Sequence, residues 1–161
     1  HSRVIGWLLD PCARHGLGSR VLAGLLRAVR GDDLAPSAMP ALGAATVELE
    51  VVRDEGRVDI LVKAPGVTLV IENKVDSPES EGQCDAYYRL FSREPSTCFV
   101  FLSPDGRRPS SASGEAQEVF RTLSYKTLRS AVLTALADVG PGVPGRVVAE
   151  DYCRTLEEEF S

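Results

Sequence analysis

Residues 57–74, RVDILVKAPGVTLVIENK, contain two short apolar runs separated by a proline–glycine pair. The runs cover residues 58–62 and 67–71 and consist mainly of valine, leucine and isoleucine. Pro65 and Gly66 are residue types that favour tight turns, and short β-rich runs on both sides of such a turn are typical of a β-hairpin. The stretch therefore predicts two antiparallel strands joined at Pro65 and Gly66.

The predicted turn determines which residues of the hairpin face each other. A two-residue loop gives the pairs Ala64 with Val67, Lys63 with Thr68, Leu61 with Val70, and Asp59 with Glu72. Directly opposed residues have Cβ atoms about 5 Å apart, and alternation along the strand puts Lys74 on the face of Glu72. The sequence therefore predicts that Asp59, Glu72 and Lys74 gather at the open end of the hairpin.

These three side chains suggest a metal site. Two opposed carboxylates repel each other, which is unfavourable in a sheet kept only for stability, and a divalent cation removes that repulsion. Mg²⁺ typically takes one or two carboxylates and leaves its other positions to water and substrate phosphate. Polar residues at strand ends are common, but the neighbouring positions here are apolar, and unpaired carboxylates beside a buried sheet are costly. With a lysine nearby to hold a phosphate or help activate water, the pattern predicts phosphodiester hydrolysis.

The same residues resemble the split signature of a known family. Val58-Asp59 followed by Ile71-Glu72-Asn73-Lys74 is similar to the signature of the PD-(D/E)XK nuclease superfamily, with Val58 in place of the nominal proline. GRVDILV and LVIENKVDSPESEGQCDAYYRL resemble one branch, in which a helix carrying Gln and Tyr follows the second strand. Upstream, WLLDP and HGLGS resemble the amino-terminal helices of that branch, so the resemblance covers most of residues 2–91.

The resemblance implies a fold and an activity. The fold is α/β, with a restriction-endonuclease-like core of order α-β-β-β-α-β and a mixed central sheet flanked by helices. We expect a single domain over residues 1–161. The implied activity is metal-dependent hydrolysis of nucleic acid, with DNA expected before RNA. Alternatives are a catalytically silent module that binds nucleic acid or a protein, and a small-molecule phosphodiesterase.

Site roles follow from the resemblance. Asp59, Glu72 and the main-chain carbonyl of Asn73 would ligate Mg²⁺ or Mn²⁺. Lys74 would position or help deprotonate the attacking water, and Gln83 would orient water or phosphate. The family often has a further glutamate in the preceding strand, and Glu50 is the candidate, although an exposed strand face explains it equally well.

The hydrophobic pattern predicts further elements along the chain. The predicted helices cover residues 2–10, 19–30, 77–94, 124–137 and 146–160, and the other predicted strands cover residues 45–53, 97–102 and 119–123. Loops are expected over residues 31–43 and 107–114. Ser77 and Pro78 would open the 77–94 helix and put Gln83 on one face with Tyr87, which we expect to serve packing.

Composition narrows the class of protein. The chain has 161 residues, of which 43% are hydrophobic and 25% charged, as in one soluble globular domain. No apolar run approaches the ~20 residues that span a bilayer, and we expect a cytoplasmic protein without membrane contact. The four cysteines contain no CxxC pair, which argues against a zinc site. A net charge of −5 disfavours a protein that simply coats nucleic acid but does not exclude a nuclease.

Overall fold

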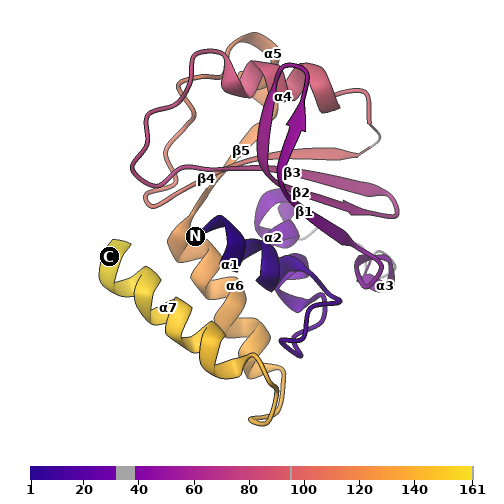
Figure 1. The fold of residues 1–161 in the computed structure, drawn as a ribbon, viewed down its shortest axis with the longest axis vertical. Coiled ribbons are helices and arrows are strands. Elements are labelled where there is room, and N and C mark those ends of the chain that lie inside the picture. The colour runs from indigo at the N-terminus through magenta and orange to yellow at the C-terminus, as the bar shows by residue number, and fades with distance from the viewer. Residues whose placement is uncertain (32–38, 95, 161) are drawn as a thin grey trace.

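A five-stranded sheet of strand order β1-β2-β3-β4-β5 forms the centre of the molecule (Figure 1). The computed structural model describes residues 1–31, 39–94 and 96–160. The strands are β1 (Thr46–Arg53), β2 (Gly56–Ala64), β3 (Val67–Asn73), β4 (Thr97–Ser103) and β5 (Phe120–Ser124). The first three strands pair antiparallel, whereas β3 with β4 and β4 with β5 pair parallel. The predicted mixed sheet is confirmed.

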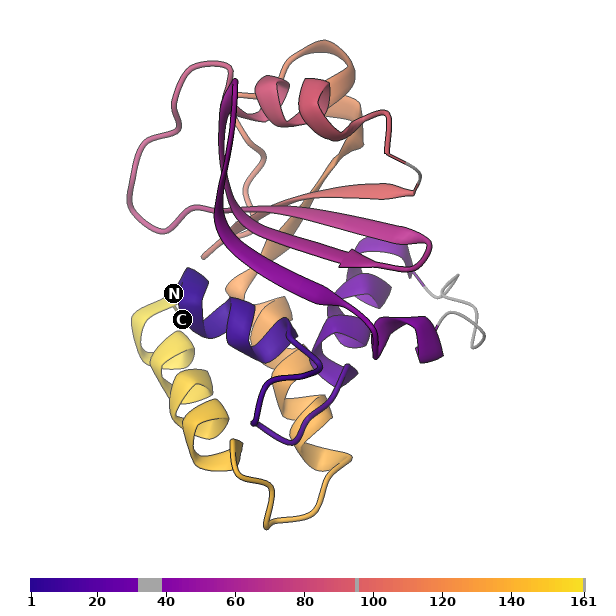
Figure 2. The ribbon, with the colours of Figure 1, turned by 45° about the vertical axis from the view of Figure 1, so that its right-hand side comes forward.

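Helices cover both faces of this sheet (Figures 1 and 2). One face carries α1 (Ser2–Leu9), α2 (Arg20–Arg30), α6 (Tyr125–Ala137) and α7 (Arg146–Phe160), and the other carries α4 (Gln83–Phe91) and α5 (Gly114–Val119). A short helix, α3 (Met39–Leu42), precedes β1. Among the described residues, no helix is both long and apolar enough to cross a membrane.

The sheet separates two hydrophobic cores because side chains alternate between its faces. Ile60 and Ile71 face the larger core with α1, α2, α6 and α7, whereas Leu61 and Val70 face the smaller core with α4. Glu72 follows Ile71 and therefore turns toward the α4 side. The hairpin strands are thus buried on both faces, and a charged residue at their end lies at the margin of a core.

The β2–β3 register is the one that the Pro65-Gly66 turn predicts, from Ala64↔Val67 through Leu61↔Val70. The pairing ends at Ile60↔Ile71, one step before the predicted pair of Asp59 with Glu72.

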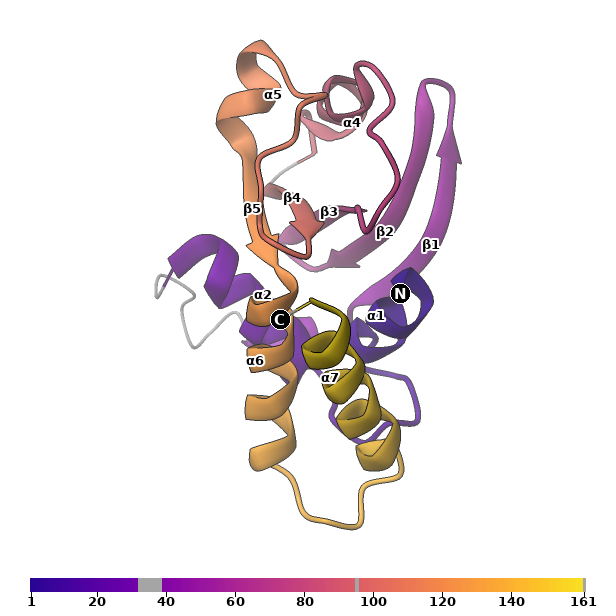
Figure 3. The same cartoon turned by 90° about the vertical axis from the view of Figure 1, so that its left-hand side faces the viewer.

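At the same level of the sheet, β1 is distorted at Glu50, whose φ of 53° is left-handed. Leu49↔Ile60 and Val51↔Val58 pair on either side of the distortion, and Val58 faces the smaller core while Ile60 faces the larger one. The far half of the β1–β2 hairpin consequently bends toward α4, as Figure 3 shows.

Two predicted elements were wrong in extent. The 77–94 helix begins only at Gln83, because Gly82 before it has a φ of 66°, and it ends at Phe91. The predicted loop 31–43 contains α3, and its residues 32–38 lie outside the described residues. The sequence pattern also did not reveal α5.

Candidate active site

A cavity of about 590 Å³ opens between the bent β1–β2 hairpin, the segment after β3, and α4. Its lining includes Asp59, Glu72, Asn73 and Lys74 from the hairpin and Gln83 from the first turn of α4. The structure therefore brings these five predicted site residues to one place. Because β3 ends at Asn73, the strand end delivers a carboxylate, a main-chain carbonyl and an ammonium in succession.

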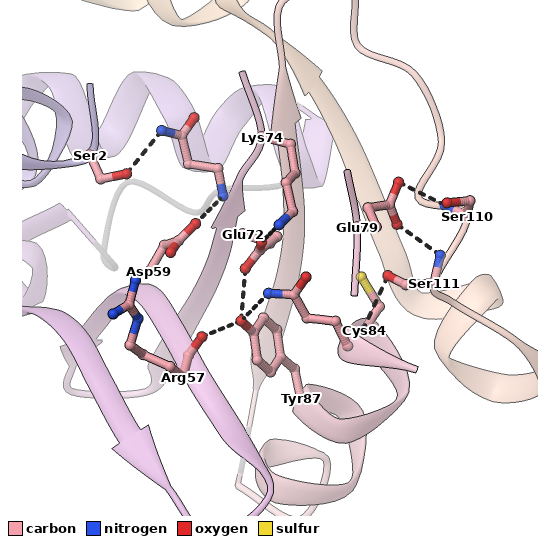
Figure 4. Close-up of polar contacts among 12 residues, drawn as sticks. Ser2, Arg57, Asp59, Glu72, Lys74, Glu79, Cys84, Tyr87, Ser110 and Ser111 are labelled. Carbon is pink, nitrogen blue, oxygen red and sulfur yellow. Dashed lines mark hydrogen bonds and ion pairs between the residues drawn. The ribbon is translucent and has the colours of Figure 1, made fainter. Parts of the chain in front are cut away.

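Glu72 is the buried centre of this cavity. Its side chain is 1% exposed, and its Oε1 lies 3.0 Å from the Lys74 Nζ. Its Oε2 accepts a hydrogen bond of 2.8 Å from the Tyr87 hydroxyl (Figure 4). Burial, followed by the negative charge of Asp59, raises the pKa of Glu72 to about 7. The carboxylate is therefore held where its charge is costly and where a cation would stabilise it.

Asp59 approaches the same point from β2. Its Oδ2 accepts the main-chain N–H of Asn73 at 2.9 Å, which replaces the ladder contact that the separated strands do not make. Burial raises the pKa of Asp59, although the Asn73 hydrogen bond and the charge of Lys74 oppose that shift. The hairpin thus ends in two carboxylates, one buried and one partly buried, whose charged forms are both disfavoured.

Tyr87 and Gln83 support Glu72 from α4. The Tyr87 hydroxyl contacts Glu72 and the main-chain carbonyl of Arg57, and it accepts a 2.9 Å hydrogen bond from Gln83 Nε2. The predicted shared face of Gln83 and Tyr87 is confirmed. Tyr87 packs in the smaller core as expected, but the prediction missed its contact with Glu72. The sequence signal for this contact was the position of Tyr87 four residues after Gln83, on the same helix face.

In the part of the chain that the structure describes, Glu50 is not one of the residues that line the cavity. Its side chain is 60% exposed and lies 3.6 Å from the Arg57 guanidinium. Its charge still helps to raise the pKa of Asp59, as the last of several influences led by burial. Glu50 therefore influences Asp59 through its charge and through the backbone distortion described above.

Glu79 anchors the segment that leads from Lys74 to α4. Its carboxylate accepts hydrogen bonds from the main-chain N–H groups of Ser110 at 3.0 Å and Ser111 at 2.7 Å (Figure 4). It also accepts a 2.5 Å hydrogen bond from Arg107 Nη1. Burial alone would raise its pKa, but these donors lower the pKa of Glu79 to about 2. The wall of the cavity is therefore tied to the loop after β4.

The donor set fits a hard divalent cation. Within the described residues no group of three or more His, Cys, Asp or Glu side chains could hold a metal ion, so a cation in this cavity would have at most two carboxylates, besides main-chain oxygens. Mg²⁺ commonly uses so few protein ligands. The buried Gln83 Oε1 has no hydrogen-bond donor among the described residues, whereas Glu72 Oε1 is paired with the Lys74 ammonium 3.0 Å away. Such an acceptor suits a cation and its water.

The comparisons with known proteins address the whole chain. A search of curated proteins and a search of solved structures each found no match. A family model described as the PD-(D/E)XK nuclease superfamily matches residues 1–154. The mixed sheet flanked by helices is consistent with the restriction-endonuclease-like fold of that family, and the resemblance predicted from the IENK segment is confirmed. The chain therefore belongs to the PD-(D/E)XK nuclease superfamily.

Proposed function

We propose that this protein is a nuclease that hydrolyses phosphodiester bonds with the help of Mg²⁺ or Mn²⁺. Membership of a superfamily of nucleases supports a nucleic-acid substrate and a divalent metal. The observation that carries the proposal is the buried Glu72 carboxylate, which faces the charge of Asp59 and has Lys74 Nζ 3.0 Å from its Oε1. Two neighbouring carboxylates that both have raised pKa values are unfavourable in a sheet kept only for stability, which favours a functional role.

Three groups would hold the cation: the carboxylates of Asp59 and Glu72 and the main-chain carbonyl of Asn73. When bound, such an ion lowers the pKa of a coordinated water and offsets the charge that develops on the phosphate. Lys74 would position the attacking water and stabilise the reacting phosphate. Gln83 would accept a hydrogen bond from that water through its Oε1. Glu50 would act from outside the cavity lining, through its charge on Asp59.

DNA is the substrate that we expect before RNA. The four cysteines are free thiols, and free thiols are typical of a reducing compartment, so we propose that the protein acts in the cytoplasm.

A cleavage assay tests the proposed activity. Single- and double-stranded DNA and RNA are incubated with the protein and Mg²⁺, Mn²⁺ or a chelator. We expect cleavage of at least one DNA substrate that requires the metal and is lost with the chelator. Binding without cleavage across all substrates and both metals would instead favour the catalytically silent module.

Metal affinity should depend on pH through Glu72. Its pKa is raised from 4.5 to about 7, so its protonation stabilises the metal-free protein fully below pH 4.5, and that stability is lost as pH rises through 7. A cation needs the deprotonated carboxylate, so affinity for Mn²⁺ should rise by roughly tenfold per pH unit below neutrality and then level off. Calorimetric titration with Mn²⁺ from about pH 5 to about pH 8 measures this. An affinity independent of pH would show that the metal does not displace a proton from Glu72.

A further inference from the structure

Asn73 occupies an unusual position at the end of β3. Its main chain still pairs with β4, in the register Asn73↔Leu102, and the next amide, Lys74 N–H, donates to the Leu102 carbonyl at 2.9 Å. On the β2 side, the Asn73 N–H donates to the Asp59 carboxylate. The peptide groups of Asn73 therefore connect the sheet to the proposed metal site.

The Asn73 side chain points the other way, toward the helices of the larger core. Its Oδ1 accepts a 2.8 Å hydrogen bond from the Tyr125 hydroxyl, and its Nδ2 donates a 2.9 Å hydrogen bond to Ser2 Oγ. Tyr125 is the first residue of α6, and Ser2 is the first residue of α1. Two helices that take no part in the cavity lining thus hold one side chain at its edge.

Tyr125 is itself rigidly placed. Its side chain is 1% exposed, and its ring packs against the rings of Phe160, with centroids 4.8 Å apart, and His1, with centroids 5.6 Å apart. A buried aromatic ring has few alternative orientations, so the position of its hydroxyl is fixed by the core. That hydroxyl in turn fixes the side-chain amide of Asn73.

We infer that Tyr125 is a positioning residue of the active site, whose hydroxyl orients Asn73 so that its N–H holds Asp59 and its carbonyl faces the cation. This inference rests on the proposed nuclease function. Groups that orient metal ligands commonly change metal affinity or activity by tenfold or more when they are lost. Tyr125 would act through Asn73 and would not touch the substrate.

Tyr152 provides a matched control. It lies in the same aromatic cluster, but its hydroxyl contacts the Nδ1 of His1 at 3.2 Å, whereas the hydroxyl of Tyr125 contacts Asn73 directly. Tyr125→Phe and Tyr152→Phe each remove one hydroxyl from a largely buried ring. Their effects on folding should therefore be similar, while only Tyr125→Phe should affect the site.

The test has three measurements: Mn²⁺ affinity by calorimetry, hydrogen exchange of the Asn73 main-chain N–H without metal, and kcat and KM for cleavage. Tyr125→Phe should weaken Mn²⁺ binding by roughly tenfold, speed exchange at Asn73 and lower kcat with little change in KM. Ser2→Ala should shift all three in the same direction. Tyr152→Phe should match wild type.

The outcomes separate this inference from the proposed function. If wild type binds Mn²⁺ and cleaves DNA but Tyr125→Phe behaves like Tyr152→Phe in all three measurements, the positioning role is overturned and the nuclease proposal stands. If wild type neither binds Mn²⁺ nor cleaves, both are overturned.

Discussion

Replacing Lys74 with alanine is expected to lower the rate of phosphodiester cleavage by a factor on the order of 10² or more, with only a modest loss of substrate binding. The ammonium lies 3.0 Å from Glu72 Oε1 on a side chain that is 10% exposed, so it acts in a site with little water, where a charge interacts strongly. An interaction made mainly in the transition state lowers kcat and leaves KM nearly unchanged. Single-turnover cleavage and equilibrium binding measure the two effects separately.

Arginine at position 74 should rescue the activity poorly. The guanidinium is planar, bulkier and permanently protonated, whereas the compact ammonium fits beside Glu72 and can share a proton with water. Full rescue by Lys74→Arg would exclude the proton-sharing role and leave only the electrostatic one.

Lys63 is the matched control for this experiment. Its ammonium forms a 3.2 Å ion pair with Glu94. Of the described residues that line the active-site cavity, Lys63 is not one. Lys63→Ala therefore removes a paired lysine from the same hairpin and should leave kcat at the wild-type value. A similar loss of kcat in both variants would mean that the hairpin, and not the Lys74 ammonium, is what the reaction needs.

Asp59→Asn is expected to abolish stabilisation by Mn²⁺ and to lower cleavage by a factor on the order of 10³, while leaving the metal-free melting temperature unchanged or higher. The asparagine Oδ1 can still accept the Asn73 N–H that Asp59 Oδ2 accepts at 2.9 Å. The substitution also removes a partly buried charge that raises the pKa of Glu72. Thermal melting with and without Mn²⁺ measures both effects.

Asp85 supplies the opposite control. Its carboxylate accepts 2.7 Å hydrogen bonds from the N–H and the hydroxyl of Ser113, which tie α4 to the residue before α5. Asp85→Asn should lower the melting temperature and leave the Mn²⁺ response intact. A metal-free Asp59→Asn protein that is destabilised by several kcal/mol would instead identify Asp59 as a structural hydrogen-bonding residue.

Local rules allowed much of this site to be predicted from the sequence. The Pro65-Gly66 turn determined the hairpin register because a two-residue loop leaves one pairing, and that register brought Asp59 toward Glu72. The spacing of Gln83 and Tyr87 placed both on one helix face.

Features that depend on distant residues could not be predicted in this way. The start of α4 depends on Gly82 and on a buried Glu79, whose partners Ser110 and Ser111 come about thirty residues later. The contact of Tyr125 with Asn73 spans 52 positions. The distortion at Glu50 has no sequence signal of its own, since glutamate rarely adopts a positive φ.

The proposed binding of a divalent cation between Asp59, Glu72 and Asn73 is tested most directly by anomalous X-ray diffraction from crystals grown with Mn²⁺. We expect one anomalous peak in contact with both carboxylates and with the main-chain carbonyl of Asn73, and no peak there in Asp59→Asn at the same Mn²⁺ concentration. Mn²⁺ bound elsewhere in the wild-type protein, with both carboxylates free of metal, would contradict the assignment.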